Sequence, residues 1–369
     1  MGWFTRIRLW LKKRSPKVTL APGYVPPKGV VVAGQRVEEQ GPTLQWLLED
    51  NPLRSFPEYR VDQLPSIEQE VLERLTSNIQ EIPPMPEIWN EIQQILQNQD
   101  ASASKLGHCI ERDPVLTAHI LTACNSAAFM AISKNSVANI PLAIARLGLN
   151  ETRSIIFQSL APDLSNEKNR HQVRHIWFHA QSIAIISRML AEPAQFEERS
   201  EASLYAMLHD IGKLVILHVE PEQKLLQLEQ AIDSGEAMLA AEYGILGYTH
   251  IDAGMMLALH WRLPREVRQF IEQHHHADQL GLDTIYEPEK MMVNHLAHLI
   301  AQHILDDGEQ HIEGGIWGAH KRHALSAKNS REAVEKLRIP VDSPIFYKQI
   351  KVAVDQLKLS FPDLFPPEP

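Results

Sequence analysis

The chain has 369 residues, and 44% of them are hydrophobic. This length and composition suffice for one large domain or two ordinary domains with real cores. The formal net charge is −10, and such an acidic balance argues against nucleic acid as a partner, because phosphates repel an acidic surface.

The two cysteines, Cys109 and Cys124, lie within apolar helical patterns. We expect them to be small buried core residues in a reducing cytoplasm, with no disulfide framework and no cysteine zinc site. We find no apolar run of the roughly 18 to 20 residues that a membrane span needs, and no secretory segment after the basic start. The expected localisation is therefore cytoplasmic.

Residues 1–15 are predicted to form a basic amphipathic helix. Its stripe of large apolar side chains consists of Trp3, Phe4, Ile7, Trp10 and Leu11. Residues 1–36 contain eight lysines and arginines and no acidic residue. This pattern is typical of a helix that contacts an anionic membrane surface, here the inner membrane, or a partner protein. An ordinary terminal helix packed on its own domain would show it as well.

Residues 16–66 are predicted to be a proline-rich linker, because eight prolines interrupt any long helix there. One short helix is expected over residues 43–49. The compact part of the chain begins near residue 67, where amphipathic periodicity starts.

Amphipathic helices then follow in series, and period-two runs typical of strands are almost missing. The expected helices cover residues 67–75, 87–97, 104–112, 114–126, 141–147 and 151–160. Asp113 is expected to cap the fourth of these, with Pro114 at the first helical position. After a loop near residues 306–310, helices resume over 330–337 and 345–357. The predicted fold class is all-α, with residues 306–369 as a C-terminal helical extension. This extension either covers the bundle or presents a surface to a partner.

Residues 204–215 form an apolar run that is interrupted by the adjacent His209 and Asp210. Burying an imidazole beside a carboxylate costs several kcal/mol unless something binds them. A divalent metal ion can do so, because imidazole and carboxylate are its common ligands. The alternative is that the two residues pair or cap within a helical core. Of the 18 histidines, 13 lie between His171 and His303, which favours a metal site.

Several motifs occur in a fixed order along the chain. They are IPPMP at residues 82–86, IERDPVLT at 110–117, CNSAAF at 124–129, ARLGLN at 145–150, WFH at 177–179, LHDIGK at 208–213 and IEQHH at 271–275. This succession resembles the HDOD domain, a divergent branch of the HD metal-dependent phosphohydrolase superfamily found in bacterial signalling proteins. The resemblance covers residues 78–305 of a domain placed at 67–305.

The resemblance implies an N-terminal helical lobe, about 78–165, packed on an HD-like helical lobe, about 166–305. It also implies a regulatory role through a signalling protein partner or a nucleotide-like ligand. The residues that it assigns to a metal site for Fe, Mn, Ni or Zn are His179, His209, Asp210, His250, His274, His275 and His298.

Two departures weigh against catalysis. His298 occupies the last ligand position, where catalytic HD proteins have aspartate, and the Gly-Tyr-Pro element of the cyclic di-GMP phosphodiesterases is absent after His275. The alternative function is a metal-dependent phosphohydrolase acting on a nucleotide, a cyclic dinucleotide or a phosphate ester. In that case Asp210 and Lys213 are the catalytic candidates, with Lys213 stabilising phosphoryl charge. A third interpretation is that the histidines only form a polar core.

Helical geometry also gives expectations for Asp252, His260, His274 and His275. Asp252, two residues after His250, is a candidate for a second carboxylate, although on a helix it points about 200° away from His250. His274 and His275 are about 100° apart on a helix, so either one alone is a ligand or the two bind different ions. His260 is expected to lie on a helix surface or to bind a backbone carbonyl.

Overall fold

A computed structural model describes residues 41–48, 66–97, 102–125, 136–191, 199–234, 236–275, 287–306 and 327–365. The chain divides into two units, Met1–Gly41 and Pro42–Pro369, and everything below concerns the second. The basic helix at 1–15, most of the linker and the loop after residue 306 lie outside the described residues, so these expectations stay predictions.

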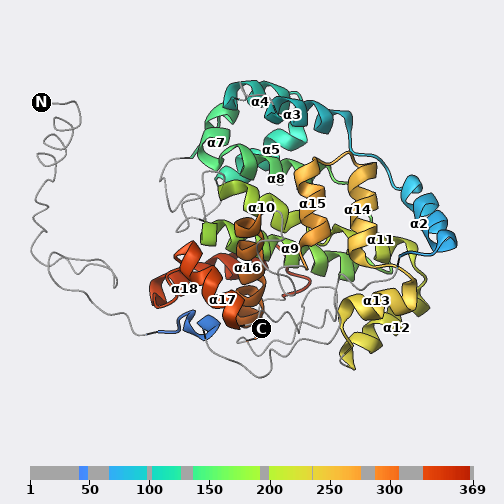
Figure 1. Ribbon diagram of the computed structural model, residues 1–369. Helices are drawn as coiled ribbons and strands as arrows, with labels where there is room; N and C mark the ends of the chain where they lie inside the picture. Colours follow the sequence, from blue (N-terminus) through green and yellow to red (C-terminus); the bar gives the residue numbers. More distant parts are fainter. Residues whose placement is uncertain are drawn as a thin grey trace, which may run out of the picture. The chain divides into compact units, whose positions relative to one another are not determined.

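The described residues form helices and contain no strand, which confirms the all-α prediction. The first group of helices is α2 (Gln69–Glu81), α3 (Glu87–Gln97), α4 (Ala103–Ile110), α5 (Pro114–Cys124), α7 (Ile140–Leu147) and α8 (Leu149–Leu160). The second is α9 (Arg170–Ala191), α10 (Arg199–Leu208), α11 (Ile211–Val219), α12 (Glu222–Asp233), α13 (Met238–Leu246), α14 (His250–His260), α15 (Arg265–Gln273) and α16 (Pro288–Asp306). Figure 1 shows their arrangement around α9 and α10.

Local sequence chemistry sets several of these boundaries. The Asp113 carboxylate accepts hydrogen bonds from the backbone N–H groups of Val115 and Leu116, with Pro114 at the first helical position, as predicted. The predicted end of the first helix, at residue 75, is wrong, because α2 continues to Glu81. Burial of Ile79 in the core outweighs the weak helix formers near residue 77.

The apolar run around His209 folds as two helices rather than one. Helix α10 ends at Leu208, a turn holds His209 and Asp210, and α11 begins at Ile211. The 18-residue window Ala202–Val219 passes a length and hydropathy test for a membrane span with a mean hydropathy of 1.2, which the sequence analysis overlooked. It is 89% buried inside the protein and is broken by the turn, as expected for two core helices.

Aromatic side chains and two hydrogen bonds join the first group of helices to the second. Trp89 contacts Phe157 edge-on at 5.5 Å between ring centroids, and Phe157 contacts Trp261 at 5.9 Å. The ring of His260 donates from Nε2 to the Ile82 carbonyl at 2.7 Å, which confirms one of its two expected placements. Trp261 donates to the Pro83 carbonyl at 3.0 Å. The end of α14 thus binds the proline-rich turn between α2 and α3.

The C-terminal helices pack on the bundle. Helix α18 (Pro344–Lys358) packs on α9, and α17 (Ala327–Leu337) packs on α16 and on the short helix η1 (Gln45–Leu48). Arg331 donates two hydrogen bonds to the Leu48 carbonyl, so this linker segment is held against the body.

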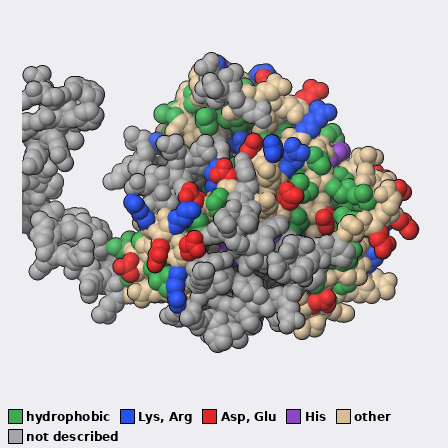
Figure 2. All heavy atoms as spheres, viewed as in Figure 1, with side chains coloured by type: hydrophobic (Ala, Val, Ile, Leu, Met, Phe, Trp, Pro, Cys, Tyr) green, Lys and Arg blue, Asp and Glu red, His purple; other side chains and the backbone are tan. Residues whose placement is uncertain are grey.

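The surface and the cysteines agree with the composition. Cys109 and Cys124 are both buried and free. On the face drawn in Figure 2, basic and acidic side chains are interspersed over the described helices, without a large patch of one sign.

Candidate metal centre

Seven buried polar residues meet at the centre of the second group of helices, and they are the seven that the sequence analysis selected. They are His179 on α9, His209 and Asp210 in the turn between α10 and α11, His250 at the start of α14, His274 and His275 after α15, and His298 on α16. None of the seven is more than 7% exposed. Five chain segments therefore supply one site.

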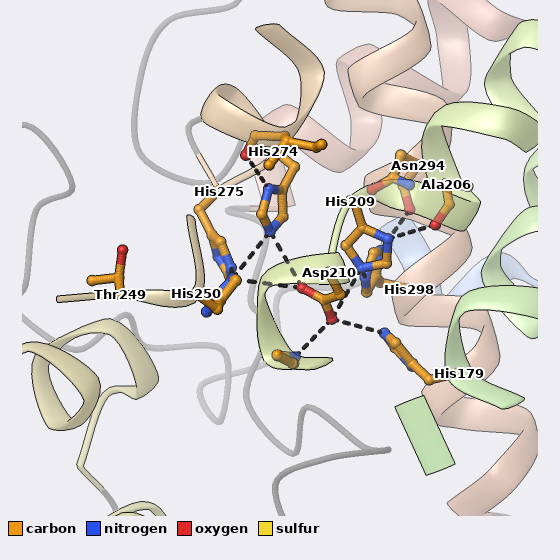
Figure 3. A network of polar contacts seen from close by, with 12 residues as sticks. His179, Ala206, His209, Asp210, Thr249, His250, His274, His275, Asn294 and His298 are labelled. Atoms are coloured by element: carbon orange, nitrogen blue, oxygen red, sulfur yellow. Dashed lines mark hydrogen bonds and ion pairs between the residues drawn. The ribbon is translucent and has the colours of Figure 1, made fainter. Parts of the chain in front are cut away.

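The Asp210 carboxylate lies in the middle of this cluster, and each of its oxygens faces different histidines (Figure 3). Its Oδ2 is 3.2 Å from Nε2 of His209 and 3.7 Å from Nε2 of His179. Its Oδ1 is 3.5 Å from Nε2 of His250 and 3.5 Å from Nε2 of His274. One carboxylate thus separates two histidine groups.

We call His179, His209 and His298 the first trio. The second trio consists of His250, His274 and His275. Within the first trio the ligand nitrogens lie within 4.8 Å of one another, and those of the second trio do so together with an Asp210 oxygen. Each trio with one carboxylate oxygen offers four ligands of the kind that transition metals prefer.

The expected separation of His274 from His275 does not hold, because both belong to the second trio. His274, the C-cap residue of α15, keeps helical backbone angles (φ −61°, ψ −24°), and both histidines lie in the turn that ends the helix. Their ring centroids are 4.3 Å apart, and both Nε2 atoms approach that of His250, at 3.3 and 3.0 Å.

Asp252 is outside the cluster, as its helical position predicted. Its carboxylate accepts hydrogen bonds from the backbone N–H and the hydroxyl of Thr249, at 2.8 and 2.7 Å, and forms the capping box of α14. This cap places His250 as the first residue of the helix.

Hydrogen bonds at Nδ1 set the tautomer of the central histidines. His209 donates from Nδ1 to the backbone carbonyl of Ala206. His298 donates to the backbone carbonyl of Asn294 at 2.9 Å, and His274 donates to that of Ile271 at 2.7 Å. A carbonyl only accepts, so Nδ1 carries the proton in each ring and the Nε2 of the neutral ring presents a lone pair.

These lone pairs point at one another. Nε2 of His209 is 3.0 Å from Nε2 of His298, and His250 and His274 meet in the same way at 3.3 Å. Two lone pairs at this distance repel unless a cation lies between them. Burial lowers the pKa of His274 to about 3, so a proton is a poor candidate for that cation there. The donor set fits a metal ion.

Comparison with known proteins identifies the family. The family model of the HDOD domain matches residues 82–277, more than half of the chain. The chain belongs to the HDOD domain family. The resemblance in the sequence motifs is thereby confirmed, and the helical fold agrees with it.

Two solved structures and one relative are similar to this HDOD protein. An HDOD domain protein of unknown function from Geobacter sulfurreducens is 23% identical, with a TM-score of 0.54 over 78% of this chain and 99% of that one. A Marinobacter aquaeolei VT8 protein provisionally assigned to signal transduction is 19% identical, with a TM-score of 0.55 over 81% and 69%. An uncharacterised protein of Treponema pallidum (strain Nichols) is 24% identical over 204 residues, which are 54% of this chain. The match spans only 39% of the length of the Treponema protein.

Asp210 of this HDOD protein is ionised. Burial would raise its pKa, but the Lys213 ammonium beside the carboxylate helps to hold the pKa well below its usual range. Lys213 Nζ is 2.6 Å from Asp210 Oδ2, and the lysine is 1% exposed. The two catalytic candidates from the sequence are therefore in direct contact.

The sequence analysis missed Glu242. Its carboxylate lies 2.8 Å from Nδ1 of His250 and accepts the His250 backbone N–H at 2.9 Å. A carboxylate behind a ligand histidine raises the basicity of its Nε2. The signal in the sequence was a single acid in the apolar run of α13, where a 2% exposed glutamate requires a partner.

Proposed function

We propose that this HDOD protein holds two divalent transition-metal ions, one on each histidine trio, and acts as a signalling protein through a protein partner or a nucleotide-like ligand. The observation that carries the proposal is the Asp210 carboxylate, with one oxygen toward each trio. A cluster of seven buried polar residues is costly to maintain without a bound cation.

The donor set determines which ions are preferred. Six imidazoles and one carboxylate favour borderline ions that bind nitrogen, such as Fe, Ni or Zn, over Mg or Ca, which prefer oxygen. Mn, the remaining candidate, fits less well because it also prefers oxygen. When bound, such ions supply Lewis acidity and lower the pKa of a coordinated water. They would also hold α9, α14, α16 and two turns together, so that metal loading stabilises the module.

A regulatory role agrees with the charge of the site. With His298 in place of a second carboxylate, and with Lys213 beside Asp210, the protein offers little negative charge to balance two dications. A bound anionic ligand can supply that charge, and a nucleotide-like signal has such groups.

Metal content of the full chain, purified without a histidine tag or chelator, tests the proposal. We expect about two equivalents in the wild type, about one in His298→Ala, and strong loss of both in Asp210→Asn, because Asp210 serves both trios. His175→Leu is the matched control, since His175 is a buried histidine on α9 outside the cluster. A metal-free wild type that takes up none of the four ions on soaking would refute the site.

The second candidate is a metal-dependent phosphohydrolase, favoured by one carboxylate shared between two metal positions with a buried lysine beside it. Here Asp210 would hold the ions close together and Lys213 would stabilise phosphoryl charge. The metal-loaded protein would be assayed with bis(p-nitrophenyl) phosphate and cyclic dinucleotides. Turnover that is lost in both Asp210→Asn and Lys213→Met supports hydrolysis. Metal binding without turnover would favour the regulatory role over hydrolysis.

A further inference from the structure

The two halves of the centre differ in the charge beside them. On the side of the first trio, the Lys213 ammonium lies 2.6 Å from Asp210 Oδ2, the same oxygen that faces His209 and His179. On the side of the second trio, the Glu242 carboxylate lies behind His250. One half thus has an additional cation and the other an additional anion.

We propose that the Lys213 ammonium competes with the first trio's metal ion for Asp210 Oδ2, so that the two ions load in order. The second trio fills first. The first trio fills only when the ammonium leaves Oδ2. This inference rests on the proposed metal centre and specifies how that centre is loaded.

The charges support this order. A dication on the first trio and an ammonium on Oδ2 would compete for one oxygen, and like charges repel strongly in a buried site. The Nδ1 atoms of His209 and His298 donate to neutral backbone carbonyls. The Glu242 carboxylate instead makes His250 a stronger ligand and offsets part of the charge of an ion on the second trio.

Lysine is suited to such a role, because its ammonium is a compact point charge on a flexible four-carbon stem. Without metal, the same ammonium compensates the buried Asp210 carboxylate, which would otherwise be costly.

The test is a titration of the chelator-stripped full chain with Zn²⁺ against a chromophoric competitor. We expect two phases in the wild type, separated by about tenfold or more in affinity. In Lys213→Met the weaker phase should tighten by about tenfold, so that the phases approach each other. Lys290→Met is the control, because Lys290 is also buried but pairs with Glu287, and both phases should persist there.

Two further variants identify the phases and serve even where Lys213→Met does not fold. His298→Ala, in the first trio, should remove only the weaker phase, and His274→Ala, in the second, should remove the tighter one. Three outcomes would overturn ordered loading but not the metal centre. They are loss of the tighter phase in His298→Ala and of the weaker phase in His274→Ala, a single affinity for both ions in the wild type, and unchanged phases in folded Lys213→Met. A wild type that binds no metal would overturn the proposed function itself.

Discussion

Glu242 shows how one residue outside the ligand set controls the site. Its carboxylate contacts both Nδ1 and the backbone N–H of His250, so it sets the tautomer and orientation of that ring. Asp252 lies near the same helix start but binds Thr249 instead. Glu242 therefore supports a metal-site histidine, whereas Asp252 caps the helix.

Glu242→Gln should weaken metal binding by about 10-fold to 100-fold, because the amide removes the charge behind His250. Competition with a chromophoric chelator measures this loss. Asp252→Asn is the control and should keep the wild-type affinity. Equal affinities in Glu242→Gln and the wild type would contradict the assigned role of Glu242.

His175 is a buried histidine that the centre does not use. It is 2% exposed, and neither ring nitrogen has a hydrogen-bond partner among the described residues. Burial lowers its pKa to about 4, and the nearby His171 contributes. The folded protein therefore keeps His175 neutral at pH values at which the unfolded chain, with a histidine pKa near 6.5, becomes charged.

The sign of the pH dependence follows from proton uptake. Below about pH 6.5 the unfolded state binds a proton that folded His175 does not, so the free energy of unfolding falls as the pH drops toward 4. His175→Leu should reduce this slope by about 1 kcal/mol per pH unit. Urea unfolding of the metal-free protein between pH 7 and 4.5 measures it, and identical slopes would contradict the prediction.

At the scale of elements, the contact between α11 and α14 positions His250. A Cβ atom on Gly212 would clash with the His250 carbonyl oxygen and would lie 2.6 Å from the Gly254 backbone nitrogen. The two helices thus touch through their backbones near Asp210 and His250. Only glycine at residue 212 permits this approach.

Gly212→Ala should separate α11 from α14, destabilise the protein by about 3 kcal/mol or more, and reduce metal binding at the second trio. Thermal unfolding and metal content measure the two effects. Gly244→Ala is a matched control, because Gly244 is also within a helix and a Cβ there meets nothing within 4 Å. It should be neutral or stabilising by about 1 kcal/mol. Similar behaviour of the two variants would contradict this account of the helix contact.

At the scale of the whole molecule, charge is distributed unevenly along the chain. The eight basic residues of segment 1–36 are accompanied by no acid, whereas the full chain has a net charge of −10. We propose that residues 1–15 attach the protein to an anionic membrane surface through their basic and apolar faces, while the body remains in solution.

Deleting residues 1–15 should abolish sedimentation with phosphatidylserine vesicles, because both the basic charge and the apolar stripe are lost. Wild-type binding should weaken as salt is added, since screening reduces attraction to anionic lipids. Neutral vesicles are the control and should bind little of either protein. Binding that survives the deletion would assign the contact to another part of the chain.

The sequence by itself determined the all-α class and most helix positions, and its resemblance to the HDOD domain assigned the seven residues of the cluster. Helical periodicity and caps such as Asp113 are local, and the motif around His209 and Asp210 has a recognisable order. These features need no knowledge of distant contacts. The expectation that His274 and His275 serve different ions did not hold, because both rings reach His250 at the end of α15.

Only the tertiary structure decided how the cluster is divided. His209 meets His298 from 89 residues away in the chain, and Asp210 directs one oxygen to each trio. The positions of Glu242 and Lys213, which make the two halves unequal, also come from packing between helices. No local pattern encodes these distances, because they depend on how α9, α11, α14 and α16 pack together.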